Sequence, residues 1–117
     1  MIYTVTLNPS IDYIVHAETI EMGAVNRMSA DLKLPGGKGI NVSRILKRLE
    51  VPAIATGFLG GFTGRFIDDW LEAEGVPTDF TPIEADTRVD IKLKADGETG
   101  INGLGPSVSS LEIARLK

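Results

Sequence analysis

Two adjacent glycines placed directly before an amphipathic run constrain this chain more than any other feature of its sequence. Gly36 and Gly37 are followed by Lys38 and a third glycine, Gly39. Apolar residues then recur at the spacing of one helix face, at Val42, Ile45, Leu46 and Leu49. Because glycine has no Cβ, it permits close backbone approach and turns that other residues resist. The pattern predicts a glycine loop that begins a helix.

The residues of this loop leave two interpretations open. Free amides at a helix start and the Lys38 ammonium favour an anion or a hydroxyl-rich ligand. Glycines that only make a tight turn, with Lys38 in solvent, explain the same residues equally well. Lys38 is followed by glycine rather than Ser or Thr, so the nucleotide P-loop pattern is not met. The glycines between Gly57 and Gly64 are wrongly spaced for the dinucleotide fingerprint and are better explained by helix packing.

The order of the apolar runs predicts an α/β fold. Strands are expected at residues 2–7, 53–59 and 78–83, which are rich in apolar or β-branched residues. Amphipathic helices are expected after Gly39 and over residues 62–71. Strand, helix, strand, helix, strand is the order of a parallel sheet with helices covering its faces.

A second, smaller sheet is predicted apart from this core. Residues 11–20 and 25–34 read as extended arms of mixed polarity, joined by a turn at Met22-Gly23. Residues 87–95 alternate strictly and predict a one-sided antiparallel strand whose polar face carries Arg88, Asp90, Lys92 and Lys94. Asp96-Gly97 is a hairpin signal, and residues 98–102 are expected to return beside that strand.

Composition limits the classes of partner. The chain has 117 residues, 43% of them apolar and 24% charged, which suits a single modest core. A net charge of -4 gives no overall attraction to nucleic acid or to an anionic membrane. No stretch is long enough to span a bilayer, and the absence of cysteine excludes disulfides and thiolate sites. We expect a cytoplasmic protein that binds neither nucleic acid nor membranes.

Several polar residues are candidates for ligand contacts. Asp12 follows the Asn8-Pro9-Ser10 turn, where a carboxylate can accept hydrogen bonds at the carboxyl edge of a sheet, although a local turn carboxylate explains it as well. Cations that could converge on phosphate oxygens are Arg27, Arg88 and Lys92. Charges on an exposed strand can also serve only to prevent edge-to-edge aggregation. His16 is the single histidine, so histidine triads and multi-histidine metal sites are excluded and a surface position is expected.

The C-terminal residues predict the start of one more helix. Ser109 and Glu112 have the spacing of a capping box, and apolar residues follow. The sequence stops at Lys117 after about two helical turns, which are marginal without further packing. We therefore expect the N-terminal part of a longer protein.

Taken in order, these motifs resemble the ribokinase-like, or PfkB, family of carbohydrate kinases. The residues that carry the resemblance are Thr6-Leu7-Asn8-Pro9-Ser10-Ile11-Asp12, Val25-Asn26-Arg27, Pro35-Gly36-Gly37-Lys38-Gly39-Ile40-Asn41-Val42 and Thr87-Arg88. Further similarity, through Gly57-Phe58-Leu59-Gly60-Gly61 and Asn102-Gly103-Leu104-Gly105-Pro106, favours the branch that acts on fructose 1-phosphate. The tagatose-6-phosphate kinase branch is the nearest alternative.

The resemblance implies one incomplete kinase domain, the N-terminal part of a three-layer α/β fold. Strands near residues 12–34 and 87–102 would form a small lid over the sugar, and a homodimer through that lid is expected. Asp12, Gly37 and Asn41 would contact sugar hydroxyls, with Gly36 in the same loop. Arg27, Lys38 and Arg88 would lie near the substrate phosphate, with Lys92 as a further candidate.

The implied reaction is ATP-dependent phosphorylation of fructose 1-phosphate to fructose 1,6-bisphosphate with Mg²⁺. Its catalytic aspartate, in a Gly-Ala-Gly-Asp stretch, is expected beyond residue 117, together with most of the ATP site. Within the chain, no catalytic or metal-binding residue is assigned. Two other hypotheses stay open: a non-catalytic module for sugar-phosphate binding or dimerisation, and a purely structural α/β domain.

Overall fold

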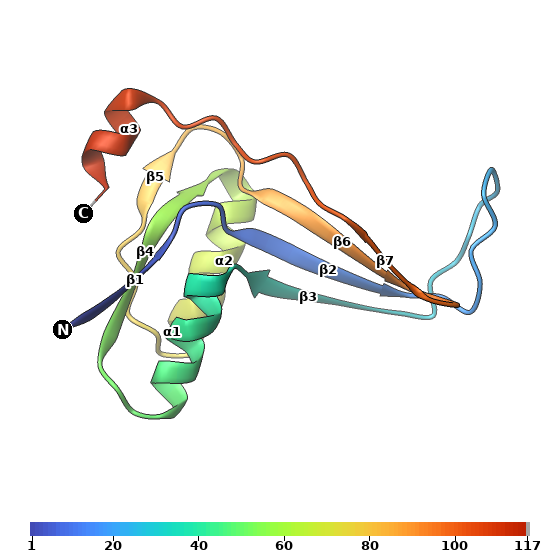
Figure 1. Ribbon diagram of the computed structural model, residues 1–117, viewed down its shortest axis with the longest axis horizontal. Helices are drawn as coiled ribbons and strands as arrows, with labels where there is room; N and C mark the ends of the chain where they lie inside the picture. The colour runs from blue at the N-terminus through green and yellow to red at the C-terminus, as the bar shows by residue number, and fades with distance from the viewer. Residues whose placement is uncertain (117) are drawn as a thin grey trace.

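The chain forms two separate sheets in the computed structural model, which describes residues 1–116 (Figure 1). The core sheet contains β1 (Ile2–Thr6), β4 (Ala53–Gly60) and β5 (Thr81–Ile83) in the order β1-β4-β5. Both strand pairings are parallel. The predicted parallel sheet is therefore confirmed, although the third strand is shorter than expected and Thr78 forms only an isolated bridge with Ala55.

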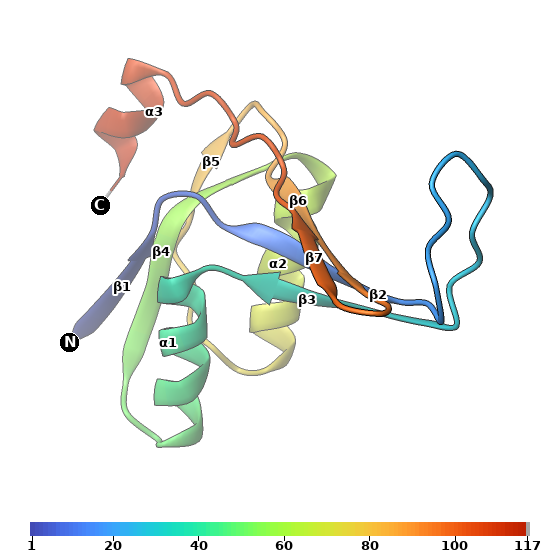
Figure 2. The ribbon, with the colours of Figure 1, turned by 45° about the vertical axis from the view of Figure 1, so that its right-hand side comes forward.

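Two helices pack on the core sheet. Helix α1 (Lys38–Arg48) contacts β1 and β4, and helix α2 (Gly61–Ala73) contacts β4. Between them and the sheet lies one apolar cluster, formed by Ile11, Ile40, Ala55, Leu59, Ile67, Leu71 and Val76. Both helices lie to the same side of β1 and β4 (Figure 2). The α/β class is confirmed, but these two helices do not cover both faces as expected, and Tyr3 and Val5 of β1 stay more than half exposed.

The second sheet, here called the outer sheet, has the order β3-β2-β6-β7. Its strands are β2 (Ser10–His16), β3 (Ala30–Gly36), β6 (Arg88–Lys94) and β7 (Glu98–Ile101). β2 pairs antiparallel with β3, and β6 pairs antiparallel with β7 as the hairpin signal predicted. The expected wholly antiparallel environment of β6 is wrong, because its other neighbour, β2, runs parallel to it. Both strands leave the core sheet in the same direction, so they can only meet in parallel.

The segment between β2 and β3 differs most from expectation. Residues 17–29 lie outside the strands, so the extended arms predicted over residues 11–20 and 25–34 are shorter than expected. The cause is local: Asn26 Oδ1 accepts from the Glu21 amide, and its Nδ2 donates to the Glu21 and Ala24 carbonyls. These bonds close a loop that competes with strand pairing. The predicted turn at Met22-Gly23 is confirmed, with Gly23 at φ 78°.

The chain returns from β7 to the core through residues 102–109 and ends in helix α3 (Ser110–Arg115). The predicted capping box is present, since Ser109 Oγ accepts from the Glu112 amide and Glu112 Oε1 accepts from the Ser109 amide. Glu112 Oε2 also accepts from the Glu84 amide, which ties α3 to the segment after β5. None of the helices within residues 1–116 is long and apolar enough to cross a membrane.

A two-pronged ion pair joins α1 to the end of α2. Arg44 donates from Nε and Nη2 to the two carboxylate oxygens of Glu74, at 2.7 and 3.0 Å. The Arg44 hydrogen bond holds the pKa of Glu74 below its ordinary value of 4.5. Arg44 stabilises the ionised carboxylate of Glu74 in the folded state but not in the unfolded state. The pair therefore stabilises the fold at pH values above 4.5.

We predict that this stabilisation is lost as the pH falls below 4.5, through the lowered pKa of Glu74. Glu74→Gln should cost about 1 kcal/mol of unfolding free energy at pH 7, because the pair is only partly buried, and the cost should shrink progressively as the pH falls below 4.5. Urea unfolding at pH 7, 5, 4 and 3 measures the difference between the two proteins. Glu72→Gln, at an exposed position two residues before Glu74, is the matched control. A constant difference across these pH values would contradict the prediction.

Candidate functional site

The candidate site is built around the carboxyl end of β1, where the glycine loop crosses it. Gly37 is the N-cap residue of α1 and has φ 126°, a conformation that L side chains rarely adopt. A Cβ on Gly37 would lie 2.6 Å from Thr6 Cγ2, and one on Gly39 would overlap Thr6 Oγ1. Both glycines are thus required for α1 to begin against β1. This close packing agrees with the tight-turn interpretation of the loop, and it leaves the α1 amides at the same edge as the candidate ligand residues.

Gly36 meets the first of those residues, Asp12. A Cβ on Gly36 would lie 2.5 Å from both carboxylate oxygens of Asp12, so the glycine is what admits the carboxylate beside the loop. Asp12 Oδ1 accepts from Ser10 Oγ at 2.7 Å, and Asp12 Oδ2 lies 3.6 Å from Lys92 Nζ. These two contacts orient the carboxylate across the start of α1.

Lys38 and Asn41 occupy the first turn of α1. Their side chains are exposed, and the Asn41 amide donates to the Gly37 carbonyl as the first bond of the helix. Both side chains therefore stand at the positive end of the helix, close in the chain to Gly36. This arrangement suits hydroxyl or phosphate oxygens.

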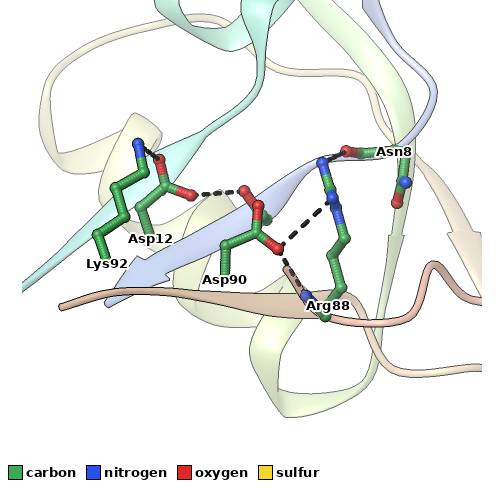
Figure 3. A network of polar contacts seen from close by, with 7 residues as sticks. Asn8, Asp12, Arg88, Asp90 and Lys92 are labelled. Carbon is green, nitrogen blue, oxygen red and sulfur yellow. Dashed lines mark hydrogen bonds and ion pairs between the residues drawn. The ribbon is translucent and has the colours of Figure 1, made fainter. Parts of the chain in front are cut away.

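Arg88 begins β6 at the same edge. Its Nη2 donates to the Asn8 carbonyl at 3.1 Å, and its Nη1 lies 3.4 Å from Asp90 Oδ1. The Arg88 Nε is buried and has no hydrogen-bond partner among the described residues. Figure 3 shows the two ion pairs side by side, Lys92 with Asp12 and Arg88 with Asp90, across the neighbouring strands β2 and β6.

Asp90 is the residue that the sequence placed wrongly. The alternation of β6 correctly put it on the polar face with Arg88 and Lys92, but it is only 7% exposed rather than solvated. It stands opposite Asp12 in the parallel register of β2 and β6, and its Oδ1 accepts from the Gly103 amide at 2.9 Å. No local signal predicts this, because the covering segment lies 13 residues further along the chain.

Arg27 is not brought together with the other candidates. It lies in the exposed loop beyond His16 and Ala30, the pair that ends the β2–β3 ladder. Asp12 stands four residues back along β2, which is about 13 Å of strand. The loop projects away from the core in both ribbon views (Figures 1 and 2). His16, at the same far end, is exposed as expected.

The described residues contain neither a metal-ligand cluster nor a nucleotide P-loop. Within residues 1–116, no group of three or more His, Asp or Glu side chains is arranged to hold a metal ion. The glycine loop also lacks the residue that follows lysine in a nucleotide P-loop. The polar groups at this edge are hydrogen-bond acceptors and cations of the kind that hold a hydroxylated anion.

A family model described as the pfkB family carbohydrate kinases matches residues 5–115, nearly the whole chain. The chain belongs to the pfkB family of carbohydrate kinases. The expected family and ribokinase-like fold are thereby confirmed.

Among members of the pfkB family, the chain is similar to 1-phosphofructokinase of Bacillus subtilis, with 58% identity over 109 residues. That match covers 93% of this chain and 36% of the relative. It is also similar to tagatose-6-phosphate kinase of Staphylococcus epidermidis, with 37% identity over 100% of this chain and 38% of the relative. A crystal structure from Staphylococcus aureus, described as a phosphofructokinase, superimposes with a TM-score of 0.95 at 47% identity, covering 99% of this chain and 38% of that one. The chain thus spans little more than a third of the length of these relatives.

We predict that Gly36→Ala displaces the Asp12 carboxylate, which its Cβ would contact, and destabilises the fold by about 1 kcal/mol through the lost Ser10 hydrogen bond. Gly100→Ala is the control, since Gly100 is also a strand residue but has no atom within 4 Å of the added Cβ. It should stay within about 0.5 kcal/mol of the original protein. Urea unfolding compares the two variants, and equal effects would show that Gly36 does not set the position of Asp12.

Proposed function

We propose that this chain binds the sugar phosphate in an ATP-dependent kinase that converts fructose 1-phosphate to fructose 1,6-bisphosphate. The observation that carries the proposal is the meeting of the Asp12 carboxylate, the α1 N-terminus and Arg88 at one edge of the core sheet. The similarity to 1-phosphofructokinase supports this acceptor among the sugars phosphorylated by the family.

Each group has a chemical role in holding that acceptor. The Asp12 carboxylate accepts hydrogen bonds from sugar hydroxyls, and the Gly36-Gly37 backbone lets the ring approach closely. The Asn41 amide side chain contacts a further hydroxyl. The cations Lys38, Arg88 and Lys92 lie near the substrate phosphate, with Arg88 supplying a planar fork that matches its oxygens.

The phosphoryl donor of the carbohydrate kinase family is ATP, and we propose that Mg²⁺ assists it. Since the described residues contain neither a P-loop nor a metal-ligand cluster, we assign both groups, and the aspartate base, to parts of the enzyme outside this chain. By itself the chain is expected to bind fructose 1-phosphate without turning it over. A tagatose phosphate is the alternative acceptor, supported by the similarity to tagatose-6-phosphate kinase.

A chimera with the Bacillus subtilis relative tests the proposal. Residues 1–117 replace the matching segment of that 1-phosphofructokinase, and ATP-dependent turnover of fructose 1-phosphate is measured beside tagatose 6-phosphate. We predict activity on fructose 1-phosphate and a loss of about 100-fold or more in kcat/KM for Arg88→Ala, which removes a charge-assisted phosphate contact. Arg65→Ala, at an exposed position on α2, is the matched control. A folded chimera that prefers tagatose 6-phosphate would overturn the choice of acceptor, and one in which Arg88→Ala has no effect would leave only the structural interpretation.

We further propose that the outer sheet forms a homodimer through the loop of residues 17–29. Met22 and Val25 are 90% and 89% exposed in that loop, although Asn26 holds its backbone in order. The position of Arg27 also supports a second copy, because the loop is too far from Asp12 for Arg27 to reach a phosphate in its own site.

Sedimentation equilibrium of the chain should therefore show a dimer. Met22→Asp combined with Val25→Asp should shift it to a monomer, because burying two carboxylates in an interface is costly. Thr19→Asp, on the same loop but adding a charge at an already polar side chain, is the control for charge alone. A monomer at every concentration for the original chain would overturn the dimer.

A further inference from the structure

Residues 102–109, here called the strap, return from β7 to the core and pass directly over Arg88. The strap meets β6 at Gly103, where an added Cβ would overlap the Val89 carbonyl oxygen and lie 3.2 Å from Arg88 Cβ. It meets Asn8 at Gly105, where an added Cβ would lie 3.0 Å from Asn8 Nδ2. The strap thus touches both the stem of Arg88 and the residue whose carbonyl receives the Arg88 guanidinium.

Asp90 holds the strap in this place. Its Oδ1 accepts from the Gly103 amide at 2.9 Å, a normal hydrogen-bond length, whereas Arg88 Nη1 is 3.4 Å from the same oxygen. The shorter contact is to the strap. Asp90 therefore acts first as an acceptor for the strap and only second as a counter-charge for Arg88 (Figure 3).

These contacts leave one donor of Arg88, its Nε, without a hydrogen-bond partner in the described chain. Gly103 lies beside the Arg88 stem, and Arg88 Nη2 donates to the Asn8 carbonyl, so both ends of the side chain are held. Its Nε is buried. Buried polar atoms of native proteins are nearly always paired, so an unpaired donor of this kind points to a ligand acceptor. A phosphate oxygen of the sugar is the acceptor of the required charge.

We propose that Asp90 is a positioning residue, which fixes the Arg88 guanidinium for the substrate phosphate by holding the strap against it through the Gly103 amide. The part that concerns the phosphate rests on the proposed function; the part that concerns Arg88 does not. In this role Asp90 acts by accepting one hydrogen bond, from the Gly103 amide. A neutral side chain of the same shape that accepts this bond, asparagine, should therefore fix Arg88 equally well.

Two variant pairs separate this role from the charge of Asp90. Asp90→Ala removes the acceptor, and Asp90→Asn keeps it without the charge. Gly103→Ala forces the strap away from the β6 backbone at Val89, and so from the neighbouring Arg88 stem, while Gly97→Ala, which meets no atom within 4 Å, is its control. Thermal unfolding followed by circular dichroism verifies that each variant is folded, and the Gly103 pair decides the question if Asp90→Ala does not fold.

Two measurements are then made on the whole chain. In the first, the Arg88 Nε–H resonance, assigned by its loss in Arg88→Lys, reports the position of the guanidinium without any ligand. It should be shifted or broadened in Asp90→Ala and Gly103→Ala and retained in Asp90→Asn and Gly97→Ala.

In the second, calorimetric titration with fructose 1-phosphate should show about tenfold weaker binding for Asp90→Ala and Gly103→Ala, the loss of one charge-assisted contact. Asp90→Asn should stay within about threefold of the original chain, since it keeps the contact that carries the role.

The outcomes are distinguishable. If the original chain does not bind fructose 1-phosphate, the proposed function fails, and the Nε–H resonance still decides whether Asp90 positions Arg88. An unchanged resonance in Asp90→Ala and Gly103→Ala overturns the proposal. So does an Asp90→Asn variant as impaired as Asp90→Ala, because the charge rather than the acceptor would then be responsible.

Discussion

The carboxyl end of β1 packs closely against the backbone of two other segments, the start of α1 and β4, and the rest of the structure depends on that contact. Thr6 is only 6% exposed there, and an added Cβ on Gly37, Gly39 or Gly57 would overlap its side chain or its carbonyl. These three glycines bring the start of α1 and the end of β4 to one edge of the core sheet. The chain also leaves this edge into β2 and returns to it through β3, so every candidate ligand residue except Arg27 is positioned from one junction.

The four charged side chains Asp12, Arg88, Asp90 and Lys92 on the outer sheet balance one another. They can therefore orient a bound anion, but they do not attract it by a net charge. The parallel register of β2 and β6 places Asp12 opposite Asp90, and like charges in that position repel. Lys92 and Arg88 compensate, each beside one of the two carboxylates. Two acids and two bases give no surplus charge for an anion. Binding of a phosphate here must therefore draw on the α1 N-terminus, on Lys38 and on the unpaired edge of Arg88, each of which acts over a short range.

Sequence patterns predicted those features that are set locally. Apolar spacing identified α1 and α2, the Asp96-Gly97 pair identified the β6–β7 hairpin, and Ser109 with Glu112 identified the last helix. The burial of Asp90 could not be predicted, because it depends on a strap that folds back from beyond the hairpin.

The distance of Arg27 from Asp12 could not be predicted from the sequence for a related reason. A motif records the order of residues along the chain and not the direction in which a strand carries them. Here β2 runs away from the core sheet and β3 runs back, so Arg27, in the loop between them, lies far from the site.

All four connections between the two sheets lie at one end of the outer sheet, at residues 7–9, 37, 84–87 and 102–109. The candidate ligand residues Asp12 and Arg88 stand near that end, where the core restrains them on several sides, and Lys92 reaches back to Asp12 from farther along β6. Toward the far end, the strands rely on one another. Tyr13 donates to Asp31 at 2.9 Å, and Lys33 lies 4.7 Å from the centre of the Tyr13 ring. Such exposed cross-strand contacts are worth only about 0.2–1 kcal/mol each. The far end therefore gains most from a covering partner, and a partner placed there would not have to disturb the restrained end to which the sugar phosphate is assigned.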